Sequence, residues 1–336
     1  MKAAVHDAYG GPEVLRLDDL PVPEPKPGEI RIRVMATTVN RTDCGFRAAT
    51  PFITRAFTGL TRPKFRVLGN EVAGIVDKLG DGVTGFQVGQ AVVGMTGDPG
   101  GGQAEYLCMK AKGAVGPKPR GLSFIEAVTL LDGPMLARAY VRAIAPARGM
   151  AVLVNGASGS IGLNAVQWLR HLAPKGEGMV LDAVCKTGTV DLLHDLGAER
   201  VYDYKREDFT ATDARYDVIF DAVGRSRYRY CRPLLKDGGT YMSTELGPGC
   251  ENPLLALRSA AFGGRKKIRF PLPGANRKVL DEITALAEAG ALRPMIDRVL
   301  PLEEIVAATE YVESEEKVGT VVILPNPLDE DAGREV

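Results

Sequence analysis

Three glycines in the middle of the chain separate an apolar run from a segment with helical periodicity. The run Ala151–Asn155 contains two valines and no charge, which predicts a fully buried parallel strand. Gly156, Gly159 and Gly162 follow it, and Leu163–Leu169 repeats apolar residues at helical spacing. Such a turn lets the backbone approach a pyrophosphate, which the free N–H groups of the helix N-terminus then bind. We therefore predict a dinucleotide site formed by Gly156, Ala157, Ser158, Gly159, Ser160, Ile161 and Gly162.

This interpretation has an alternative. The G-x-G-x-x-G pattern is imperfect, because alanine occupies its first glycine position. Many strand-to-helix turns also carry glycine for steric reasons alone. The order strand, glycine turn, helix favours the cofactor site over a bland loop.

The end of the second strand of such a unit selects between NAD and NADP. Proteins that prefer NAD place Asp or Glu there, where the carboxylate accepts hydrogen bonds from the ribose 2′-OH. We expect this strand at Met179–Cys185, so Cys185 takes the position of the acid and Lys186 follows it. A carboxylate repels a 2′-phosphate whereas a lysine attracts it, so we expect NADPH as the cofactor.

Plain counting gives a different answer. Asp182 lies about 20 residues after Gly162, the spacing of the acidic residue in NAD sites. Ala183 and Val184 continue the strand past Asp182, however, which favours Cys185 as the strand end.

The elements around this unit indicate an α/β fold. After Gly162 the expected strands are 179–185, 200–202, 217–222, 239–243 and 267–270, with helices at 189–196 and 226–235. This alternation predicts a parallel, doubly wound sheet with right-handed crossovers. The first 120 residues instead give short strands between Pro and Gly clusters, at 15–17, 29–35, 72–79, 91–95 and 104–109. Ser123 and Glu126 form a capping box that predicts a helix through Leu131, and a second helix is expected at 136–144.

Composition restricts the class of protein. At 336 residues, two domains are expected. The 42 basic and 42 acidic residues cancel, so no global field favours nucleic acid or an anionic membrane. Five scattered cysteines without a C-x-x-C pair fit reduced thiols. No apolar run is long enough to span a membrane, and the first residues lack the apolar core of a signal peptide, so we expect a cytoplasmic protein.

The chain resembles the zinc-independent medium-chain dehydrogenase/reductases, especially the NADPH quinone and enone oxidoreductases. The motifs that carry the resemblance are Gly28–Val34, Asn40–Asp43, Leu68–Gly74, Asn155–Gly162, Leu196–Ala198, Asp203–Tyr204 and Tyr216–Gly224. The resemblance implies a β-rich GroES-like catalytic domain, residues 1–121 and 276–336, that is discontinuous around a Rossmann domain, residues 122–275. It also implies an active site in the cleft between the domains, and a homodimer.

The same resemblance bears on zinc. Zinc-dependent relatives place a cysteine at the position of Asn40, a histidine at that of Asn70, and a cysteine near that of Asp132. Amide nitrogens do not coordinate zinc, so only Glu71 and Asp132 remain as donors. Both have ordinary alternatives, since Glu71 can pair with an arginine and Asp132 can cap a helix. We predict that no metal is bound.

Without zinc, other groups must stabilise the charge that grows on a carbonyl oxygen when hydride reaches the acceptor. By its position in the family pattern, Asn40 is the first candidate for the hydrogen-bond donor and Asn70 the second. Either asparagine can instead merely bridge loops. No general acid is apparent in the sequence, so we expect the proton to come from water.

The resemblance adds cofactor contacts. It places Tyr204 near the 2′-phosphate, although an ordinary tyrosine at a strand end is the alternative. Val223 and Ser243, at the ends of later strands, complete the predicted cofactor set. Arg62, Lys64 and Arg66 can line a substrate cleft or be solvated surface cations.

The sequence does not fix the acceptor. We expect a small quinone or α,β-unsaturated carbonyl. The alternatives are an NADP-dependent alcohol dehydrogenase or enoyl-thioester reductase on the same scaffold, and a non-catalytic NADPH-binding protein.

Overall fold

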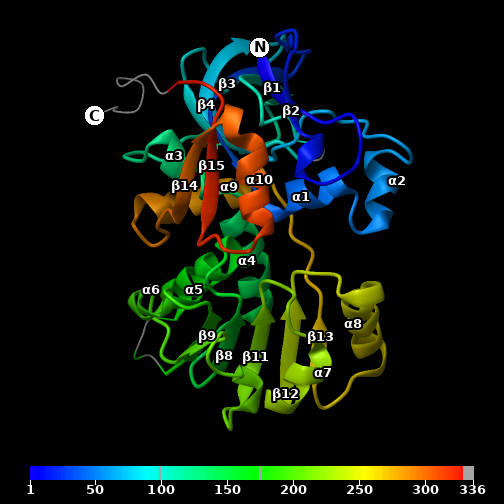
Figure 1. The fold of residues 1–336 in the computed structure, drawn as a ribbon. Coiled ribbons are helices and arrows are strands. Elements are labelled where there is room, and N and C mark those ends of the chain that lie inside the picture. The colour runs from blue at the N-terminus through cyan, green and yellow to red at the C-terminus, as the bar shows by residue number, and fades with distance from the viewer. Residues whose placement is uncertain (98–99, 174–175, 177, 328–336) are drawn as a thin grey trace. The chain divides into compact units, whose positions relative to one another are not determined.

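The computed structural model describes residues 1–97, 100–173, 176 and 178–327, and it divides into two compact units. Unit 1 comprises Met1–Asp132 and Ala275–Val336, and unit 2 comprises Gly133–Gly274 (Figure 1). In the described part of the chain, no helix has the length and apolar character needed to cross a membrane.

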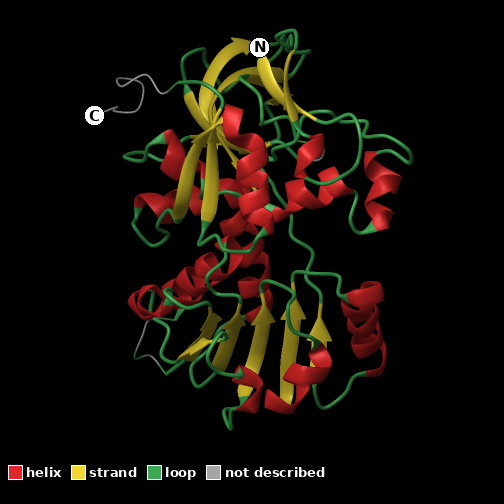
Figure 2. Cartoon of the chain, in the orientation of Figure 1, coloured by secondary structure: helices red, strands yellow, loops and turns green. Residues whose placement is uncertain are grey.

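Unit 2 is built on six parallel strands in the order β10-β9-β8-β11-β12-β13. The strands are β8 (Ala151–Asn155), β9 (Val180–Cys185), β10 (Val201–Asp203), β11 (Tyr216–Asp221), β12 (Leu235–Ser243) and β13 (Lys267–Arg269). The helices are α4 (Asp132–Ile144), α5 (Ser160–Leu172), α6 (Val190–Asp195), α7 (Tyr228–Cys231) and α8 (Glu251–Phe262). The strand order reverses between β8 and β11, which makes this a Rossmann sheet whose switch point lies beside the glycine turn that follows β8. Figure 2 shows the strands of the chain in yellow and its helices in red.

The parallel strands of unit 2 are apolar because both of their faces are covered. Val152, Leu153 and Val154 of β8 are all fully buried, as are Ile219 and Phe220 of β11. This burial fixes the carboxyl ends of the strands, and those ends carry the predicted cofactor residues.

Unit 1 is a GroES-like, β-rich domain. Its large sheet has the order β14-β15-β3-β4-β5-β7, with β6 also paired to β3, and a separate hairpin joins β1 to β2. The strands are β1 (Lys2–Val5), β2 (Arg16–Asp19), β3 (Glu29–Val39), β4 (Glu71–Leu79), β5 (Ala91–Met95), β6 (Tyr106–Lys110), β7 (Ala114–Pro117), β14 (Ile296–Pro301) and β15 (Thr320–Leu324). The helices are α1 (Arg41–Ala48), α2 (Arg55–Thr58), α3 (Phe124–Val128), α9 (Arg277–Glu288) and α10 (Ile305–Glu313). Because β15 pairs with β3, the end of the chain completes the sheet that its beginning starts.

The predicted fold class is confirmed, with differences in detail. The capping box of Ser123 and Glu126 is present, but the helix ends at Val128. Segment 122–132 belongs to unit 1, where we had assigned it to the second domain, because α3 packs on β3, β4 and β5. β3 runs four residues further than expected, since residues 36–39 are buried like the rest of the strand.

Candidate functional site

The three glycines of the turn after β8 have different reasons to be glycine. Gly156 has φ +77°, and a Cβ there would lie 2.6 Å from Val223 Cβ. A Cβ on Gly162 would lie 2.3 Å from the carbonyl oxygen of Gly156. Gly159 differs, since its φ is −81° and the nearest atom to an added Cβ would be the Gly156 oxygen at 3.5 Å. Neither backbone strain nor packing requires glycine at 159, whereas close approach of a pyrophosphate does.

The helix that follows supports the same interpretation. α5 has Gly159 as its N-cap, and no side chain caps its first turn. Backbone N–H groups at such a terminus bind an anion. The turn therefore fits the pyrophosphate of a dinucleotide. Ala157 and Ser158 of the turn are buried, and the Ala157 N–H donates to the Val184 carbonyl oxygen at 2.9 Å, which fixes the turn against β9.

Asp221, at the end of β11, ties the ends of neighbouring strands together. Its carboxylate accepts hydrogen bonds from Asn155 Nδ2 at 3.0 Å and from Tyr241 Oη at 2.9 Å. It also accepts from the backbone N–H groups of Gly224 at 2.9 Å and Ser226 at 3.1 Å. The side chain is fully buried, and burial raises its pKa. We had quoted this residue only as part of a motif, although an aspartate that ends a buried strand is a signal in itself.

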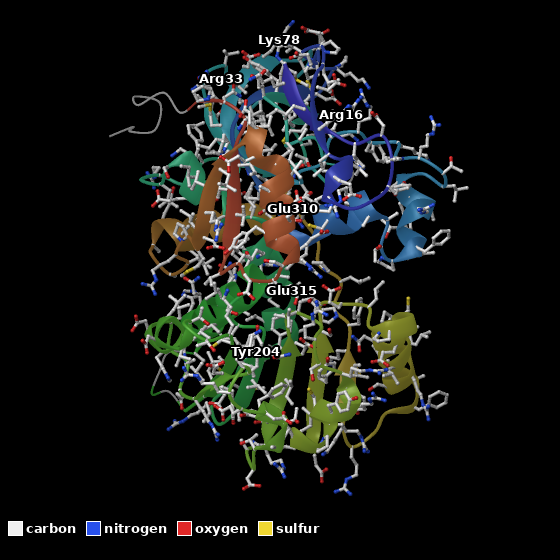
Figure 3. All side chains as sticks on the ribbon, viewed as in Figure 1. Arg16, Arg33, Lys78, Tyr204, Glu310 and Glu315 are labelled. Atoms are coloured by element: carbon white, nitrogen blue, oxygen red, sulfur yellow. The ribbon has the colours of Figure 1, made fainter. Side chains whose placement is uncertain are left out.

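β9 ends at Cys185, as predicted, and its neighbours gather basic and aromatic groups. Cys185 pairs with Asp203 in the sheet, and the Tyr204 N–H donates to the Cys185 carbonyl oxygen at 3.0 Å. Tyr204 is 48% exposed (labelled in Figure 3), and Lys205 Nζ lies 5.4 Å from the centre of its ring. Lys186 follows Cys185 directly, so the structure brings Lys186 and Tyr204 to the same edge of the sheet.

Asp182 lies inside the sheet and not at its edge. It is buried in β9, three residues before the strand end. One carboxylate oxygen accepts from Tyr216 Oη at 2.8 Å and the other from the Arg200 N–H at 3.3 Å. Both oxygens therefore have partners within the protein, and burial raises the pKa of this carboxyl.

The two remaining predicted cofactor residues lie at the same carboxyl edge of the sheet. Val223 is 39% exposed and packs over the glycine turn through Gly156. Ser243 ends β12, is buried, and accepts a hydrogen bond from the Glu245 N–H through its Oγ at 3.2 Å. The Ser243 side chain thus has a partner within the loop, and its contact with a cofactor stays a prediction.

In unit 1 the two asparagines form a directed pair. The Asp43 N–H donates to Asn40 Oδ1 at 3.0 Å, which fixes the orientation of the Asn40 amide. Asn40 Nδ2 then donates to Asn70 Oδ1 at 2.7 Å and to Glu71 Oε2 at 3.1 Å, so both of its hydrogens are used. Asn70 Nδ2 consequently points away from Asn40, and no group among the described residues accepts a hydrogen bond from it. Asn70, our second candidate, is the asparagine whose donor is available.

Glu71 lies next to the asparagine pair and accepts a hydrogen bond from Asn40. It is buried, and it accepts hydrogen bonds from Thr38 Oγ1, from Asn40 Nδ2 and, at 2.8 Å, from the Asp132 N–H. Burial raises the pKa of Glu71. Our alternative of an arginine partner is wrong for the described residues, since the hydrogen-bond donors to Glu71 are a hydroxyl, an amide and a backbone N–H.

Two further ionisable groups lie near Glu71. Asp132 begins α4, and its pKa is raised well above its usual range by burial and by the nearby charge of Glu71. Lys317 Nζ donates to the Gly319 carbonyl oxygen at 2.6 Å, and burial lowers its pKa although Glu71 and Asp132 raise it. We did not predict Lys317, because nothing in its local sequence links it to residues more than 180 positions earlier.

The donor chemistry does not fit a zinc ion. At two of the three positions where zinc-dependent relatives carry ligands, the side chains are the amides of Asn40 and Asn70. Both carboxylate oxygens of Glu71 already accept hydrogen bonds. Across the part of the chain that the structure describes, no three His, Cys, Asp or Glu side chains gather in a way that can hold a metal ion.

A small apolar pocket lies in unit 1 between α1 and the segment that leads to β4. Its lining residues are His6, Phe46, Phe57, Thr58, Pro63, Phe65 and Leu68. Phe46 is on α1, whose N-cap is Asn40, and Leu68 precedes Asn70 by two residues. The pocket and the asparagine pair are therefore built from the same two stretches of chain.

Comparisons with known proteins agree with this architecture. A family model described as alcohol dehydrogenase GroES-like domain matches residues 26–120, and one described as zinc-binding dehydrogenase matches residues 196–323. A 2-methylene-furan-3-one reductase of Solanum lycopersicum is 29% identical over 97% of this chain and 80% of its own length. An NADPH-dependent alkenal/one oxidoreductase, chloroplastic, of Arabidopsis thaliana is 27% identical over 97% of this chain and 80% of its own. Among solved structures, the quinone oxidoreductase of Coxiella burnetii superposes with a TM-score of 0.85, at 26% identity, over 96% of this chain and 99% of that one.

Proposed function

The chain belongs to the medium-chain dehydrogenase/reductases of the quinone oxidoreductase type, and from this premise we propose that it reduces a quinone or an α,β-unsaturated carbonyl with NADPH and without zinc. The observation that carries the proposal is the directed pair Asn40–Asn70, which offers one oriented amide donor at a position where zinc relatives carry a metal ligand. Three relatives named as a furanone reductase, an alkenal/one oxidoreductase and a quinone oxidoreductase support this acceptor class.

Asn70 takes the role of the donor to the acceptor. When NADPH is bound, it supplies hydride to an electrophilic carbon of the acceptor. Negative charge then grows on the carbonyl oxygen, and the N–H of Asn70 Nδ2 stabilises that charge. Asn40 acts as a positioning residue, because its own hydrogens hold Asn70 Oδ1 and Glu71 in place.

Glu71 fixes the position of the asparagine pair relative to the surrounding elements. Its carboxylate joins Thr38 of β3, Asn40 at the start of α1 and the Asp132 N–H at the start of α4. Both carboxylate oxygens of Glu71 accept hydrogen bonds from the protein, so this side chain holds the pair in place and presents no proton to the acceptor. We therefore propose that water protonates the product.

NADPH is preferred over NADH in this proposal. The position at which an acid would accept the ribose 2′-OH holds buried Cys185, and Asp182 is held by Tyr216 and Arg200. Lys186 and Tyr204 stand at the strand ends instead, which suits a 2′-phosphate. A cytoplasmic location and a homodimer remain expectations from sequence and family.

The test is a panel of acceptors with purified protein. Oxidation of NADPH is followed by the loss of its near-ultraviolet absorbance with benzoquinones, enones, 2-alkenals and saturated aldehydes as acceptors. Reduction of NADP⁺ is followed by the gain of the same absorbance with alcohols as donors. We expect turnover with quinones or enones that is insensitive to chelator, in protein that contains no stoichiometric zinc. Turnover of alcohols alone would favour an alcohol dehydrogenase. Tight NADPH binding without turnover of any acceptor would favour a non-catalytic binding protein.

A further inference from the structure

Four large apolar side chains stand out from unit 1 in one short stretch. The segment comprises a 3₁₀ turn, Phe52–Thr54, followed directly by α2 and Gly59. Phe52 is 74% exposed, Ile53 58%, Phe57 73% and Leu60 73%. Exposed apolar residues that cluster in this way mark interaction surfaces more often than they occur by chance. We call residues 52–64 the apolar lobe.

The lobe carries positive charge only. Between Thr50 and Phe65 the chain has three cations, Arg55, Arg62 and Lys64, and no acidic residue. Arg55 stacks over Phe52 at 5.1 Å and over Tyr9 at 4.8 Å. Arg62 and Lys64 are exposed, and neither forms an ion pair with any described residue.

Hydrogen bonds from Tyr9 and within the loop hold the apolar lobe in place. Tyr9 Oη bonds to Thr58 Oγ1 at 2.8 Å and donates to the Gly59 carbonyl oxygen at 2.7 Å. The Lys64 N–H donates to the Thr58 carbonyl oxygen at 2.7 Å, which closes the loop on itself. Thr58 is buried while its neighbour Phe57 is exposed. The apolar side chains are thus displayed on an anchored loop, and their exposure is not the result of a loose one.

We propose that the apolar lobe is a docking surface for an anionic lipid bilayer, into which Phe52, Ile53, Phe57 and Leu60 insert while Arg62 and Lys64 bind lipid phosphates. Aromatic and aliphatic side chains beside basic residues are the composition of segments that lie in the membrane interface. Each cation near an anionic leaflet strengthens binding, and no carboxylate of the lobe opposes it. This proposal does not depend on the reaction that the protein catalyses.

Two other occupants fit less well. A second copy that met this surface about a two-fold axis would bring Arg62 and Lys64 against the same cations of its partner, which repel. A peptide partner is normally received by a groove, whereas Phe52, Phe57 and Leu60 each keep nearly three quarters of their surface exposed and project as separate side chains. A bilayer accepts projecting side chains without a matching groove.

The proposal revises our expectation that the protein has no membrane partner. That expectation used the net charge of the whole chain, which is zero. Peripheral binding depends on local charge, because fields are screened beyond roughly 8 Å at physiological ionic strength. A lobe with three cations and no acid is attracted to an anionic surface whatever the distant charges are.

The experiment is sedimentation of the full-length protein with vesicles of phosphatidylcholine, and with vesicles in which a quarter of that lipid is replaced by phosphatidylglycerol. We expect binding to the anionic vesicles that weakens at high salt. F57S/L60S should lower the partition coefficient about tenfold, and R62E/K64E more than about twentyfold, since loss of each cation costs roughly fivefold. The matched control is V88S/L272S, which removes two apolar side chains that are 63% and 81% exposed elsewhere, and it should bind as the wild type does.

A second measurement locates the contact. Phe57→Trp adds an exposed indole, whose emission should shift to the blue on anionic vesicles and be quenched by brominated lipid. The native Trp168 is buried and should not respond. Absence of wild-type binding to anionic vesicles at low salt would overturn the proposal. So would unchanged binding of F57S/L60S, or a dimer in solution that F57S/L60S converts to monomer without any vesicle binding by the wild type.

Discussion

At the residue scale, Asn40 and Asn70 carry the same side-chain amide and differ in which of its atoms form hydrogen bonds within the protein. The backbone N–H of Asp43 orients Asn40, and Asn40 orients Asn70. Sequence analysis ranked Asn40 first, whereas our proposal assigns the donor to Asn70, because a residue type does not reveal which hydrogens are engaged. The available donor on Asn70 follows from hydrogen bonds between residues 30 positions apart.

The available donor on Asn70 predicts that loss of this side chain lowers the rate of the reaction and not the affinity for NADPH. Asn70→Ala should lower kcat for the best quinone or enone about a hundredfold, because a donor to a developing oxyanion contributes roughly 3 kcal/mol. The dissociation constant of NADPH should stay within about twofold of the wild type. Asn276→Ala, a helix N-cap elsewhere in unit 1, is the control for loss of an asparagine and should leave kcat unchanged. If kcat of Asn70→Ala is within about twofold of wild type, Asn70 is structural.

Lys186 gives a prediction about the choice of cofactor. Lys186→Glu places a carboxylate next to Cys185, where it would repel a 2′-phosphate and could accept bonds from a ribose 2′-OH. We expect the affinity for NADPH to fall about tenfold or more and the affinity for NADH to stay or rise. Nicotinamide fluorescence titration measures both. Lys267→Glu, on the far edge strand β13, changes the same charge and should alter neither affinity.

Gly159 separates a ligand constraint from a folding constraint. Gly159→Ala should leave the melting temperature within a few degrees of wild type, because its φ is ordinary and the added methyl has room. Affinity for NADPH should nevertheless fall by about tenfold or more, since the methyl takes the space of the pyrophosphate. Gly162→Ala should instead lower the melting temperature, because its Cβ would overlap the Gly156 carbonyl. Equal affinity of Gly159→Ala and wild type for NADPH would contradict the cofactor interpretation of the turn.

At the scale of elements, much of unit 2 could be predicted from sequence because its signals are local. Period, glycine position and strand length are each encoded within about 15 consecutive residues, so β8 and β9 were predicted to within one residue, whereas α5 extends three residues beyond the prediction at each end. α1 was missed because Asn40, its N-cap, was interpreted only as a site residue and Asp43, its partner in the capping box, only as part of a motif. β14 was missed because its residues are mostly exposed and carry charges, which weakens any strand pattern.

The element ends in unit 2 depend on one buried carboxylate. Asp221→Ala would leave Asn155, Tyr241 and three backbone N–H groups without their acceptor. Because unpaired buried donors cost about 1–3 kcal/mol each, we expect the melting temperature to fall by several degrees and NADPH affinity to fall with it. Differential scanning calorimetry with and without NADPH measures both effects. Asp237→Ala, which removes a carboxylate that is 61% exposed in the same unit, should change neither.

At the scale of the whole molecule, the polar cluster of unit 1 was beyond sequence analysis. Glu71, Asp132 and Lys317 come from three distant parts of the chain, and only the pairing of β15 with β3 and the start of α4 bring them near one another. No periodicity or spacing in the sequence predicts that these three side chains lie close together. The consequence of their proximity appears in a property of the entire protein, the dependence of stability on pH.

Burial raises the pKa of Asp43 to about 7 and also raises the pKa of Glu71 and of Asp132. Between about pH 4 and pH 7 the folded protein therefore holds a proton on Asp43 that the unfolded chain, with an ordinary pKa near 4, has released, and the raised pKa values of Glu71 and Asp132 act in the same sense. Stability is greatest when the folded state binds the extra protons, so this contribution is fully present at low pH and is lost as pH rises through 7. Surface carboxylates such as Asp7 and Glu251 have lowered pKa values and act in the opposite sense, but only as pH falls below about 4.

We therefore expect the melting temperature to be higher at pH 5 than at pH 8, which is unusual for a protein whose acids are mainly solvated or paired. Calorimetry from pH 4 to pH 8 at constant ionic strength measures the profile. Asp43→Asn should be less stable at every pH, because the amide cannot accept both the Asn40 and the Gly69 backbone N–H groups. Its profile between pH 5 and pH 8 should also be flatter, since the group that titrates near 7 is gone. The slope is the decisive readout: a variant with lower stability but an unchanged slope would show that Asp43 is ionised throughout in the folded protein, held so by its two backbone donors.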